Sequence, residues 1–506
     1  MNQRKLGSII SYVQMFLGVI VSLIYTPFMI QKLGQSEYGL YNTVASTISM
    51  LSVLSLGFNS SYIRYYSRYK KNEDKESIYR LNGLFIIIFI IIGIIALLCG
   101  IFLLFNIEMI FSDGLTASEY DLARKLFFLL ILNLAISFPM SVFSDIISAH
   151  ERFVFLKSLG VIRTVFSPFL SIPLLLMGYR SIAIVVVTVL LSLFTDIMYF
   201  IYVVFVLKEK FWFSGFEKGL FKDIFVFTSF IGINIIVDQI NWNIDKIVLA
   251  RFKGTVAVAI YSVGYTLNTY FNMISTSISG VFTPLVHRIT NSNLDWISKK
   301  RELTALFIKV GRVQFLILGL VASGLVVFGK QFIYFWAGEG YEDAYYVALL
   351  LILPSIIPLI QNVGIEIQRA QNKHKFRSVV YSIMAIINLV MSIYLCQIWG
   401  AVGSALGTGI SLILANGIII NIYYHKACNV NVIIFWKNII SMIPGVIIPF
   451  IIGAILMNYV VVNTLFHLGI YIIGYSILYA ICIWMFSMNS YEKKLLLRGK
   501  NSKKLC

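Results

Sequence analysis

One stretch of the sequence, residues 223–251, combines the length of a membrane span with side chains that could handle ions or an anionic cargo. About 20 apolar helical residues cross the roughly 30 Å hydrocarbon core of a bilayer. The polar members of the stretch are Asn234, Asp238, Gln239, Asn241, Asn243, Asp245 and Lys246. Because a charge at membrane depth costs about 3 kcal/mol, this helix is predicted to line a wet or polar interior.

The spacing of these side chains divides them between two sectors of the predicted helix. At about 100° per residue, four of them fall within an arc of roughly 60°. This first sector holds Asn234, Asp238, Asn241 and Asp245, and the second holds Gln239, Asn243 and Lys246. The two sectors are expected to meet different neighbours, and Asp238 or Asp245 is a candidate for coupling to H⁺ or Na⁺.

The composition indicates that many other segments also cross a bilayer. The chain has 506 residues, of which 59% are hydrophobic and 13% charged, and its mean hydropathy is +0.85. Several uninterrupted apolar runs reach spanning length, for example residues 85–105. These features predict an all-α polytopic membrane protein.

About fourteen spans are predicted, and their connections differ in charge. The spans are residues 9–30, 39–63, 82–105, 124–148, 157–177, 182–206, 223–250, 257–282, 305–328, 343–366, 378–397, 401–423, 439–459 and 465–487. Most of the 41 Lys and Arg residues lie in the connections on one side, notably 64–80, 208–222, 287–302 and 369–377. The positive-inside rule therefore predicts that both termini are cytoplasmic. It also accounts for the net charge of +18 without nucleic acid as a partner.

An internal repeat appears when the chain is shifted by 220 residues. The shift aligns Gly34 with Gly254, Tyr41 with Tyr261, Ser55 with Ser275, Arg68 with Arg288 and Thr188 with Thr408. It also superimposes the first six spans on the next six with their orientation kept, which predicts two six-helix lobes related by a parallel pseudo-two-fold axis. The expected organisation is an N-terminal lobe at 1–206, a C-terminal lobe at 223–423, an extra helix pair at 439–487 and a basic cytoplasmic tail at 488–506.

The repeat extends the candidate cavity wall beyond residues 223–251. Polar side chains recur with the same spacing on the first, second and eighth spans, and further charges lie within other spans. The additional candidates for cargo or ion handling are Gln14, Tyr25, Asn59, Asn268, Asn272, Arg163 and Arg312. Arg163 suits an anionic cargo, because a guanidinium can bind two oxygens of a diphosphate. The alternatives are hydrogen bonding between helices for the Ser and Asn stripes and snorkelling to the surface for Arg312.

No catalytic or metal-binding pattern is evident. The five His residues lie mostly in or near loops, the five Cys residues are scattered, and sequence motifs of metalloproteases, serine hydrolases and P-loop proteins are missing. The loops are also too short for an enzyme or nucleotide-binding domain. The protein is therefore expected not to be an enzyme, to need no cofactor or metal, and to draw its energy from an ion gradient or the membrane potential.

Five stretches in order along the chain resemble one transporter family. They are LGQSEYGLYN (33–42), FKGTVAVAIYSVGY (252–265), FWAGEGYEDAYYVALLLILPSI (335–356), QNKHKFRS (371–378) and WGAVGSALGTGIS (399–411). Together with the two six-helix repeats, they are similar to the polysaccharide repeat-unit flippases, which export O-antigen, capsule or exopolysaccharide units. These flippases belong to the multidrug/oligosaccharidyl-lipid/polysaccharide (MOP, MATE-like) exporter superfamily.

The resemblance implies a cargo and a place of action. The cargo would be an undecaprenyl-diphosphate-linked oligosaccharide, flipped across the bacterial cytoplasmic membrane by alternating access. The protein would act as a monomer beside a polysaccharide polymerase and glycosyltransferases. The extra helix pair resembles that of lipid II flippases, where it helps form a groove for the lipid tail. The alternatives are a lipid II flippase or a cation-coupled multidrug exporter of the same superfamily and, from another class, a membrane-embedded polysaccharide polymerase.

Overall fold

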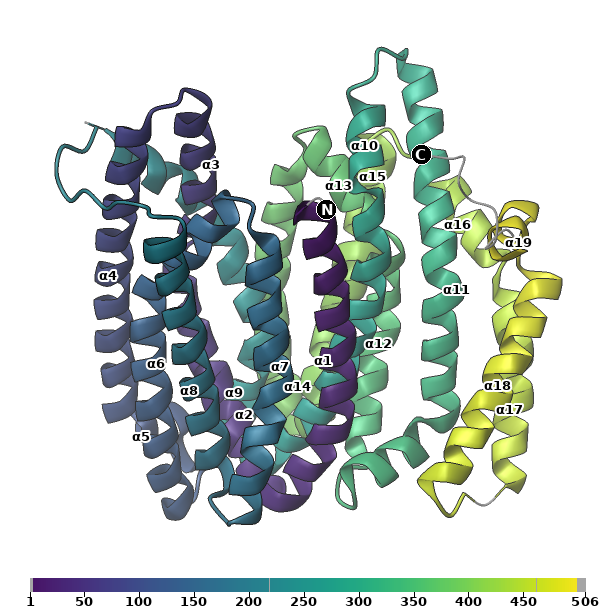
Figure 1. The fold of residues 1–506 in the computed structure, drawn as a ribbon. Coiled ribbons are helices and arrows are strands. Elements are labelled where there is room, and N and C mark those ends of the chain that lie inside the picture. The colour runs from purple at the N-terminus through teal and green to yellow at the C-terminus, as the bar shows by residue number, and fades with distance from the viewer. Residues whose placement is uncertain (1–2, 218, 461, 498–506) are drawn as a thin grey trace. The chain divides into compact units, whose positions relative to one another are not determined.

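The computed structural model describes residues 3–217, 219–460 and 462–497, and over these residues its regular secondary structure is entirely helical (Figure 1). The first half contains α1 (Gln3–Leu33), α2 (Gln35–Met50), α3 (Phe58–Lys71), α4 (Lys75–Phe105), α5 (Ile107–Phe111), α6 (Ala117–Ala149), α7 (Phe153–Leu176), α8 (Arg180–Ile201) and α9 (Leu220–Ser279). The second half contains α10 (Thr283–Thr290), α11 (Trp296–Ala337), α12 (Asp343–Ile360), α13 (Asn362–Ala370), α14 (His374–Leu412), α15 (Ile420–Lys426), α16 (Val432–Ile440), α17 (Ile443–Tyr459), α18 (Leu465–Phe486) and α19 (Ser490–Leu497). The last nine residues of the predicted tail, 498–506, lie outside the described residues.

Twelve helical stretches of the described chain are long and apolar enough to cross a membrane. Two of these stretches, Leu220–Thr290 and His374–Lys426, are interrupted where Gly254 and Gly400 leave the helical backbone conformation. Each of the two therefore supplies two arms, and every one of the fourteen predicted spans has a counterpart. The predicted all-α polytopic fold is confirmed.

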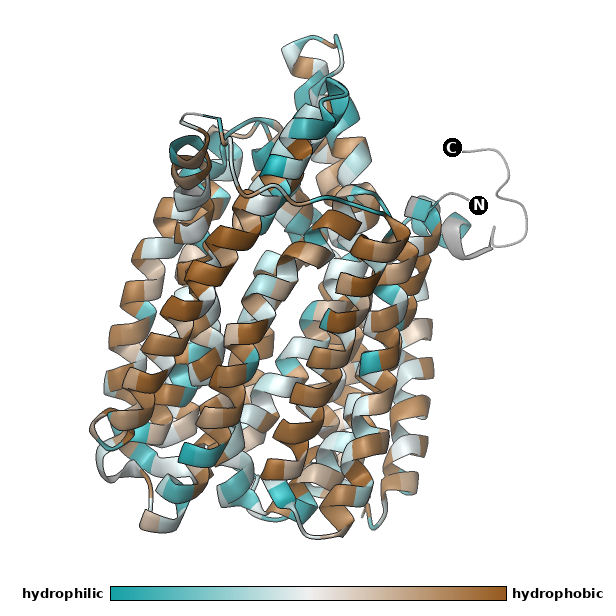
Figure 2. Ribbon diagram, turned by 60° about the vertical axis from the view of Figure 1, so that its left-hand side comes forward, coloured by the Kyte–Doolittle hydropathy of each residue, from teal (hydrophilic) through white to brown (hydrophobic). Residues whose placement is uncertain are grey.

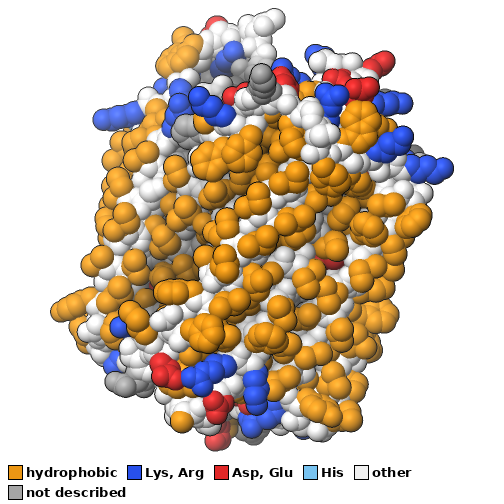
Figure 3. All heavy atoms as spheres, turned by 90° about the vertical axis from the view of Figure 1, so that its left-hand side faces the viewer, with side chains coloured by type: hydrophobic (Ala, Val, Ile, Leu, Met, Phe, Trp, Pro, Cys, Tyr) orange, Lys and Arg blue, Asp and Glu red, His pale blue; other side chains and the backbone are white. Residues whose placement is uncertain are grey.

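The distribution of side chains suits a lipid environment. Figure 2 shows hydrophobic residues along the middle of the helices and hydrophilic residues mainly toward their ends. On the face drawn in Figure 3, hydrophobic side chains cover the middle, and Lys and Arg side chains gather toward the top and the bottom of the view. Large apolar side chains that water would disfavour are exposed, among them Ile91, Leu98 and Phe102 of α4. The protein is a multi-pass membrane protein.

The helices group into two compact units. Unit 1 comprises residues 1–262 and 396–400, and unit 2 comprises residues 263–395 and 401–506. In unit 1, α4 packs on α6, α1 packs on α7, and α6 and α7 both pack on α8. The core of unit 1 contains Tyr62, whose ring meets Phe85 edge-on with the ring centroids 5.2 Å apart.

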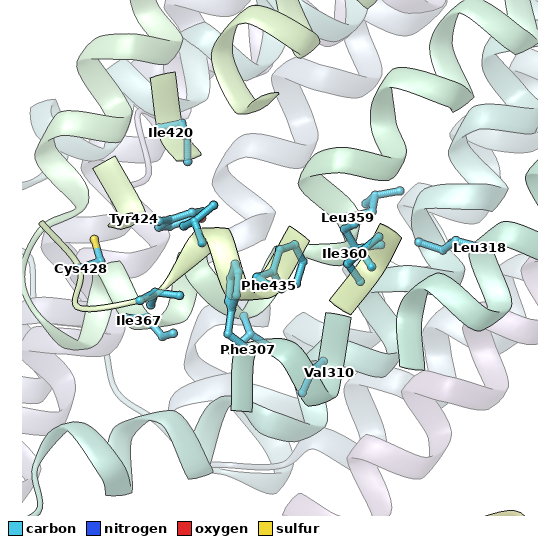
Figure 4. Packing of buried hydrophobic residues seen from close by; sticks show 14 of the residues in the cluster. Phe307, Val310, Leu318, Leu359, Ile360, Ile367, Ile420, Tyr424, Cys428 and Phe435 are labelled. Atoms are coloured by element: carbon cyan, nitrogen blue, oxygen red, sulfur yellow. The ribbon is translucent and has the colours of Figure 1, made fainter. Parts of the chain in front are cut away.

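An aromatic core holds unit 2 together (Figure 4). The ring centroids of Phe307 on α11 and Phe435 on α16 lie 4.5 Å apart, and Tyr424 on α15 meets Phe307 edge-on. Gly311 allows this approach, because a Cβ there would lie 2.5 Å from the Phe435 ring. These contacts fix α11 against α15 and α16.

The 220-residue repeat is visible in the backbone. Gly34 has φ 76° and ψ 170°, and Gly254 has φ 79° and ψ −179°. This conformation is essentially restricted to glycine, which explains why glycine occupies both positions. A second matched pair, Arg180 and Gly400, has φ values of 51° and 56°.

Within unit 1, the segments that follow the two glycine turns meet each other. Gly39 lies so close to Thr255 that a Cβ on Gly39 would be 1.8 Å from the Thr255 carbonyl oxygen. The Glu119 carboxylate joins the two segments: its Oε1 accepts hydrogen bonds from Ser36 (2.5 Å) and from Thr255 (2.6 Å). The start of α6 therefore fixes both turns.

The backbone at Gly34 provides a test of this turn. We expect Gly34→Ala to destabilise the protein by about 1–3 kcal/mol through backbone strain alone, because no atom lies within 4 Å of the added Cβ. The matched control is Gly280→Ala, where the Cβ also meets open space but φ is not positive. The control should be neutral or slightly stabilising, by up to about 1 kcal/mol. Thermal unfolding of the two purified variants gives the comparison, and equal melting temperatures would contradict the explanation.

Candidate functional site

Unit 1 contains a polar cavity of about 500 Å³ between α1, α7 and α8. Its walls carry hydroxyl, amide and charged groups at the depth of membrane-spanning helices. The lining residues are Gln14, Val21, Ser22, Tyr25, Gly160, Arg163, Thr164, Ser167, Pro168, Thr188, Leu191, Thr195, Asp196 and Tyr199.

Helical periodicity explains why these residues share one cavity. On each helix the lining positions recur mainly at spacings of three, four, seven or eight residues, which places them on one face. On α7, for example, Arg163 and Ser167 are four residues apart. Gly160 brings the helices together, because a Cβ there would lie 2.6 Å from the Gln14 side-chain nitrogen. The α1 amide consequently packs directly against the α7 backbone.

The cavity contains one positive and one negative side chain. Asp196 on α8 accepts a hydrogen bond through Oδ2 from the Ser137 hydroxyl of α6, at 3.0 Å. Arg163 on α7 acts on Asp196 electrostatically. Within the described part of the chain, no hydrogen bond or ion pair shorter than 4.0 Å engages the Arg163 guanidinium, which is exposed. The guanidinium therefore retains its donors for an anion that enters the cavity.

The structure brings three of the sequence-predicted residues together in this cavity: Gln14, Tyr25 and Arg163. Sequence reasoning did not place Asp196 there, and it missed the hydroxyl groups of α7 and α8. The polar spacing of Arg163, Thr164 and Ser167 was the available signal. It resembles the pattern that marked residues 223–251, but it contains a single charge.

Residues 223–251 form the first arm of α9, and their two polar sectors have different surroundings. Asn234 and Asp238 are exposed, Asn241 is half-buried, and Asp245 and Lys246 are buried. In the second sector, the Gln239 side chain donates a hydrogen bond to Ser52 (3.3 Å) and accepts one from Asn243 (2.6 Å). Through Ser52, that sector contacts the 3₁₀ turn at Leu51–Ser55, which interrupts the second span.

Asp245 joins the two arms of α9 within unit 1. Its Oδ2 accepts a hydrogen bond from the Tyr261 hydroxyl at 2.7 Å, across the turn at Gly254. The residues 220 positions earlier are Tyr25 and Tyr41. The second repeat therefore has a carboxylate where the first has a tyrosine.

The polar stripe of the eighth span makes hydrogen bonds between helices in unit 2. Asn268 is buried, and its Oδ1 accepts bonds from Asn272 (3.2 Å) and from Ser355 on α12 (3.4 Å). Ser275 in the same stripe receives bonds from Gln314 (3.0 Å) and Asn362 (3.1 Å). These contacts favour the alternative that the stripe joins helices.

Asn59 and Arg312 lie away from the cavity. The Asn59 amide donates to Asp145 Oδ1 at 3.2 Å inside unit 1. In unit 2, Arg312 forms a buried bidentate pair with Glu492 of α19, with distances of 2.6 and 2.8 Å. Its other donors reach the carbonyl oxygens of Asn438 (3.0 Å) and Ser487 (2.7 Å). Arg312 therefore anchors α16 and α19 to α11, rather than snorkelling to the surface.

Comparisons with known proteins identify the family and the fold of this polytopic helical chain. The chain belongs to the family described as polysaccharide biosynthesis proteins, whose profile matches residues 6–290. This confirms the family predicted from the sequence. A search of curated protein sequences finds no match.

Solved structures share the fold at low sequence identity. The lipid II flippase MurJ in an inward closed conformation has a TM-score of 0.67 at 15% identity, over 97% of this chain and 99% of that chain. An inward-facing multidrug resistance MATE family transporter of the MOP superfamily has a TM-score of 0.61 at 15% identity, over 85% and 99%. A MOP superfamily transporter from Pyrococcus furiosus has a TM-score of 0.52 at 15% identity, over 83% and 94%. The predicted MOP-type fold is confirmed.

The buried Arg312–Glu492 pair supports a prediction about stability. Glu492→Ala leaves a guanidinium buried without its anion, and we expect a loss of about 3–5 kcal/mol. The matched control is Glu366→Ala, which removes an ion pair whose Arg369 side chain is 63% exposed and should cost at most about 1 kcal/mol. Denaturant unfolding in detergent measures both losses. Equal losses would show that Arg312 does not depend on Glu492.

Proposed function

We propose that this protein flips an undecaprenyl-diphosphate-linked oligosaccharide across the bacterial cytoplasmic membrane, for the assembly of a surface polysaccharide. The observation that carries this proposal is the exposed Arg163 guanidinium in a hydroxyl-rich cavity of unit 1. The family, whose description names polysaccharide biosynthesis, supports the same class of substrate.

The chemistry of the cavity fits the head of such a cargo. The planar guanidinium of Arg163 can bind two oxygens of a diphosphate at once. Hydroxyl groups from Ser22, Ser167 and Thr188 can exchange hydrogen bonds with sugar hydroxyls. The rings of Tyr25 and Tyr199 add apolar surface for a sugar face.

The size of the cavity suits the polar head of the cargo and not its polyprenyl tail. A volume of about 500 Å³ lies within the range of about 300–1,000 Å³ typical of small-molecule sites. It can hold a diphosphate and one or two sugars, while a polyprenyl chain stays in the bilayer. Alternating access would then move the polar head and let the tail follow in lipid.

We place both termini in the cytoplasm and take the energy source to be a gradient of H⁺ or Na⁺. The basic connections between spans support this orientation. The protein would work as a monomer beside the glycosyltransferases that build the cargo and the polymerase that consumes it. Among the carboxylates of α9, Asp238 is the proposed ion-handling group because it is exposed, whereas Asp245 is buried against Tyr261.

One observation favours a second candidate function. Asp196 gives the same cavity a carboxylate, and a carboxylate attracts cations. A cation-coupled exporter of cationic drugs would use Asp196 as its main contact, whereas a flippase of diphosphate-linked cargo would use Arg163. A lipid II flippase would also use Arg163, so the sugars and peptide of the cargo must be varied to separate the two flippases.

The role of Arg163 can be tested by substitution. We expect Arg163→Ala to lower the flipping rate of a labelled polyprenyl-diphosphate oligosaccharide in proteoliposomes about 10- to 100-fold, because a hydrogen bond to a charged group contributes about 1.5–3 kcal/mol. Arg163→Lys keeps the charge but loses the planar guanidinium that can bind two oxygens. Its flipping rate should therefore lie between those of Arg163→Ala and the wild type. Arg288→Ala removes an equal charge from an exposed position of α10 and should leave the rate unchanged.

The opposite result would favour the drug exporter. If Arg163→Ala flips the lipid at the wild-type rate while Asp196→Asn abolishes efflux of a cationic dye, the anionic cargo is wrong. Thermal unfolding of each variant ensures that a lost rate does not reflect lost folding.

Substitution of the two α9 carboxylates should affect different properties, namely transport for Asp238 and stability for Asp245. We expect Asp238→Asn to lower gradient-stimulated transport several-fold with an unchanged melting temperature, because this side chain is exposed. Asp245→Asn should lower the melting temperature, because it weakens the bond to the Tyr261 hydroxyl by about 1 kcal/mol. Transport that keeps its gradient stimulation in Asp238→Asn would remove this residue from ion coupling.

A further inference from the structure

A buried carboxylate outside the cavity lacks the partners that a permanent charge requires. Asp145 on α6 is 7% exposed and lies within a membrane-spanning helix. Its Oδ1 accepts one hydrogen bond, from the Asn59 side-chain nitrogen at 3.2 Å. Its Oδ2 is buried and has no hydrogen-bond partner among the described residues. No Lys, Arg or His side chain of the described chain forms an ion pair with it.

This arrangement suits a carboxyl group that gains and loses a proton. An ionised carboxylate in a low-dielectric interior needs an opposite charge or several hydrogen bonds, and Asp145 has a single amide donor. A proton on Oδ2 removes the charge and leaves the bond from Asn59 to Oδ1 in place. Asp145 is neither exposed enough to act as a surface charge nor paired well enough to act as a structural one.

A column of polar side chains connects Asp145 to the end of unit 1 that carries the connection 207–219. Tyr62 of α3 is fully buried and lies about one helical turn after Asn59, the hydrogen-bond partner of Asp145. The Tyr62 hydroxyl donates to Asn82 of α4 (2.7 Å), and the Asn82 amide donates to Glu209 (3.1 Å).

The column ends in a partly exposed contact between a carboxylate and an imidazole ring. Glu209 and His150 lie 2.9 Å apart, with 12% and 19% of their side chains exposed. Tyr66 contacts the His150 ring at 3.0 Å. From α8, the carboxylate of Asp196 meets α6 at Ser137, about two turns away from Asp145, so it faces a different part of the helix. The titratable groups nearest in this network are therefore Tyr62, Tyr66, His150 and Glu209.

The partner of Asp145 sits beside a break in a membrane span. The span Gln35–Lys71 is interrupted after a 3₁₀ turn, where Leu56 (φ 44°) and Gly57 (φ 80°) are both left-handed. Asn59 is the second residue of α3, directly after this break. The break packs on α9, because a Cβ on Gly57 would lie 2.5 Å from the Ile231 side chain. A change in the charge of Asp145 thus acts on the first turn of a half-helix, whose N-terminal end favours negative charge.

We propose that Asp145 is a proton-binding site of this protein, that its proton exchanges with solvent at the Glu209–His150 end of the polar column, and that its protonation controls the Asn59 contact at the break in the second span. The step is the addition of one proton to Asp145 Oδ2 and its later release. The link to transport rests on the proposed function, whereas proton binding at Asp145 does not.

The site is tested directly by infrared difference spectroscopy of the full-length protein in nanodiscs, recorded between acidic and alkaline pH. We expect the wild type to show a buried carboxylic-acid C=O band, and Asp145→Asn to lose it. The matched control is Asp121→Asn, which removes a carboxylate from the same helix at a position that is 73% exposed and should keep the band. A band that persists unchanged in Asp145→Asn would overturn the proposal.

A second variant keeps the test decisive if Asp145→Asn does not fold. Asn59→Ala removes the one hydrogen bond to Asp145, so the C=O band should move to higher frequency. An unmoved band would contradict the assignment.

Transport provides a separate readout. In proteoliposomes, Asp145→Asn should lose stimulation by a proton gradient but keep flipping down a cargo gradient. Stimulation equal to the wild type would show that the proton is not used in transport. If the wild type does not flip the tested lipid at all, the proposed cargo fails, and the infrared result still decides the proton site.

Discussion

The cost of placing polar and charged groups in hydrocarbon governs this structure. Each buried charge within the spans must find a partner, and the partners show what holds the helices together. Arg312 binds Glu492 and two carbonyl oxygens, and thereby anchors the last helix. Asp245 accepts a hydrogen bond from Tyr261 and thereby joins the two arms of α9. These groups are stabilised by the protein itself and have little capacity left for cargo.

Arg163 and Asp145 differ from those structural charges. Arg163 is exposed to a polar cavity and makes no hydrogen bond within the described chain. Asp145 is buried with one oxygen unpartnered. The first arrangement fits an anion that enters and leaves, and the second fits a proton. Cargo recognition and proton binding would then lie in separate places of unit 1, on α7 and α6.

The sequence was sufficient to predict the parts of the fold that depend on local chemistry. Hydropathy marked every span, and the 220-residue shift matched Gly34 to Gly254, which share a backbone conformation that only glycine adopts readily. Sequence could not separate cavity residues from structural ones, because that depends on which helix faces which. Asp245 and Asp238 look equivalent on a helical wheel, yet one is buried against Tyr261 and the other is exposed. The surroundings of Asp196 depend on how α6, α7 and α8 pack, and those of Asp145 depend on how α3 packs against α6.

The proposed function requires that a diphosphate-linked sugar, and not a cationic drug, is the cargo. The most direct measurement is leaflet-resolved flipping of a fluorescent polyprenyl-diphosphate oligosaccharide in proteoliposomes that contain the purified protein. We expect protein-dependent transfer of this lipid between leaflets, competition by unlabelled lipid with the same head group, and no efflux of a cationic dye. Efflux of the dye without any transfer of the lipid would contradict it.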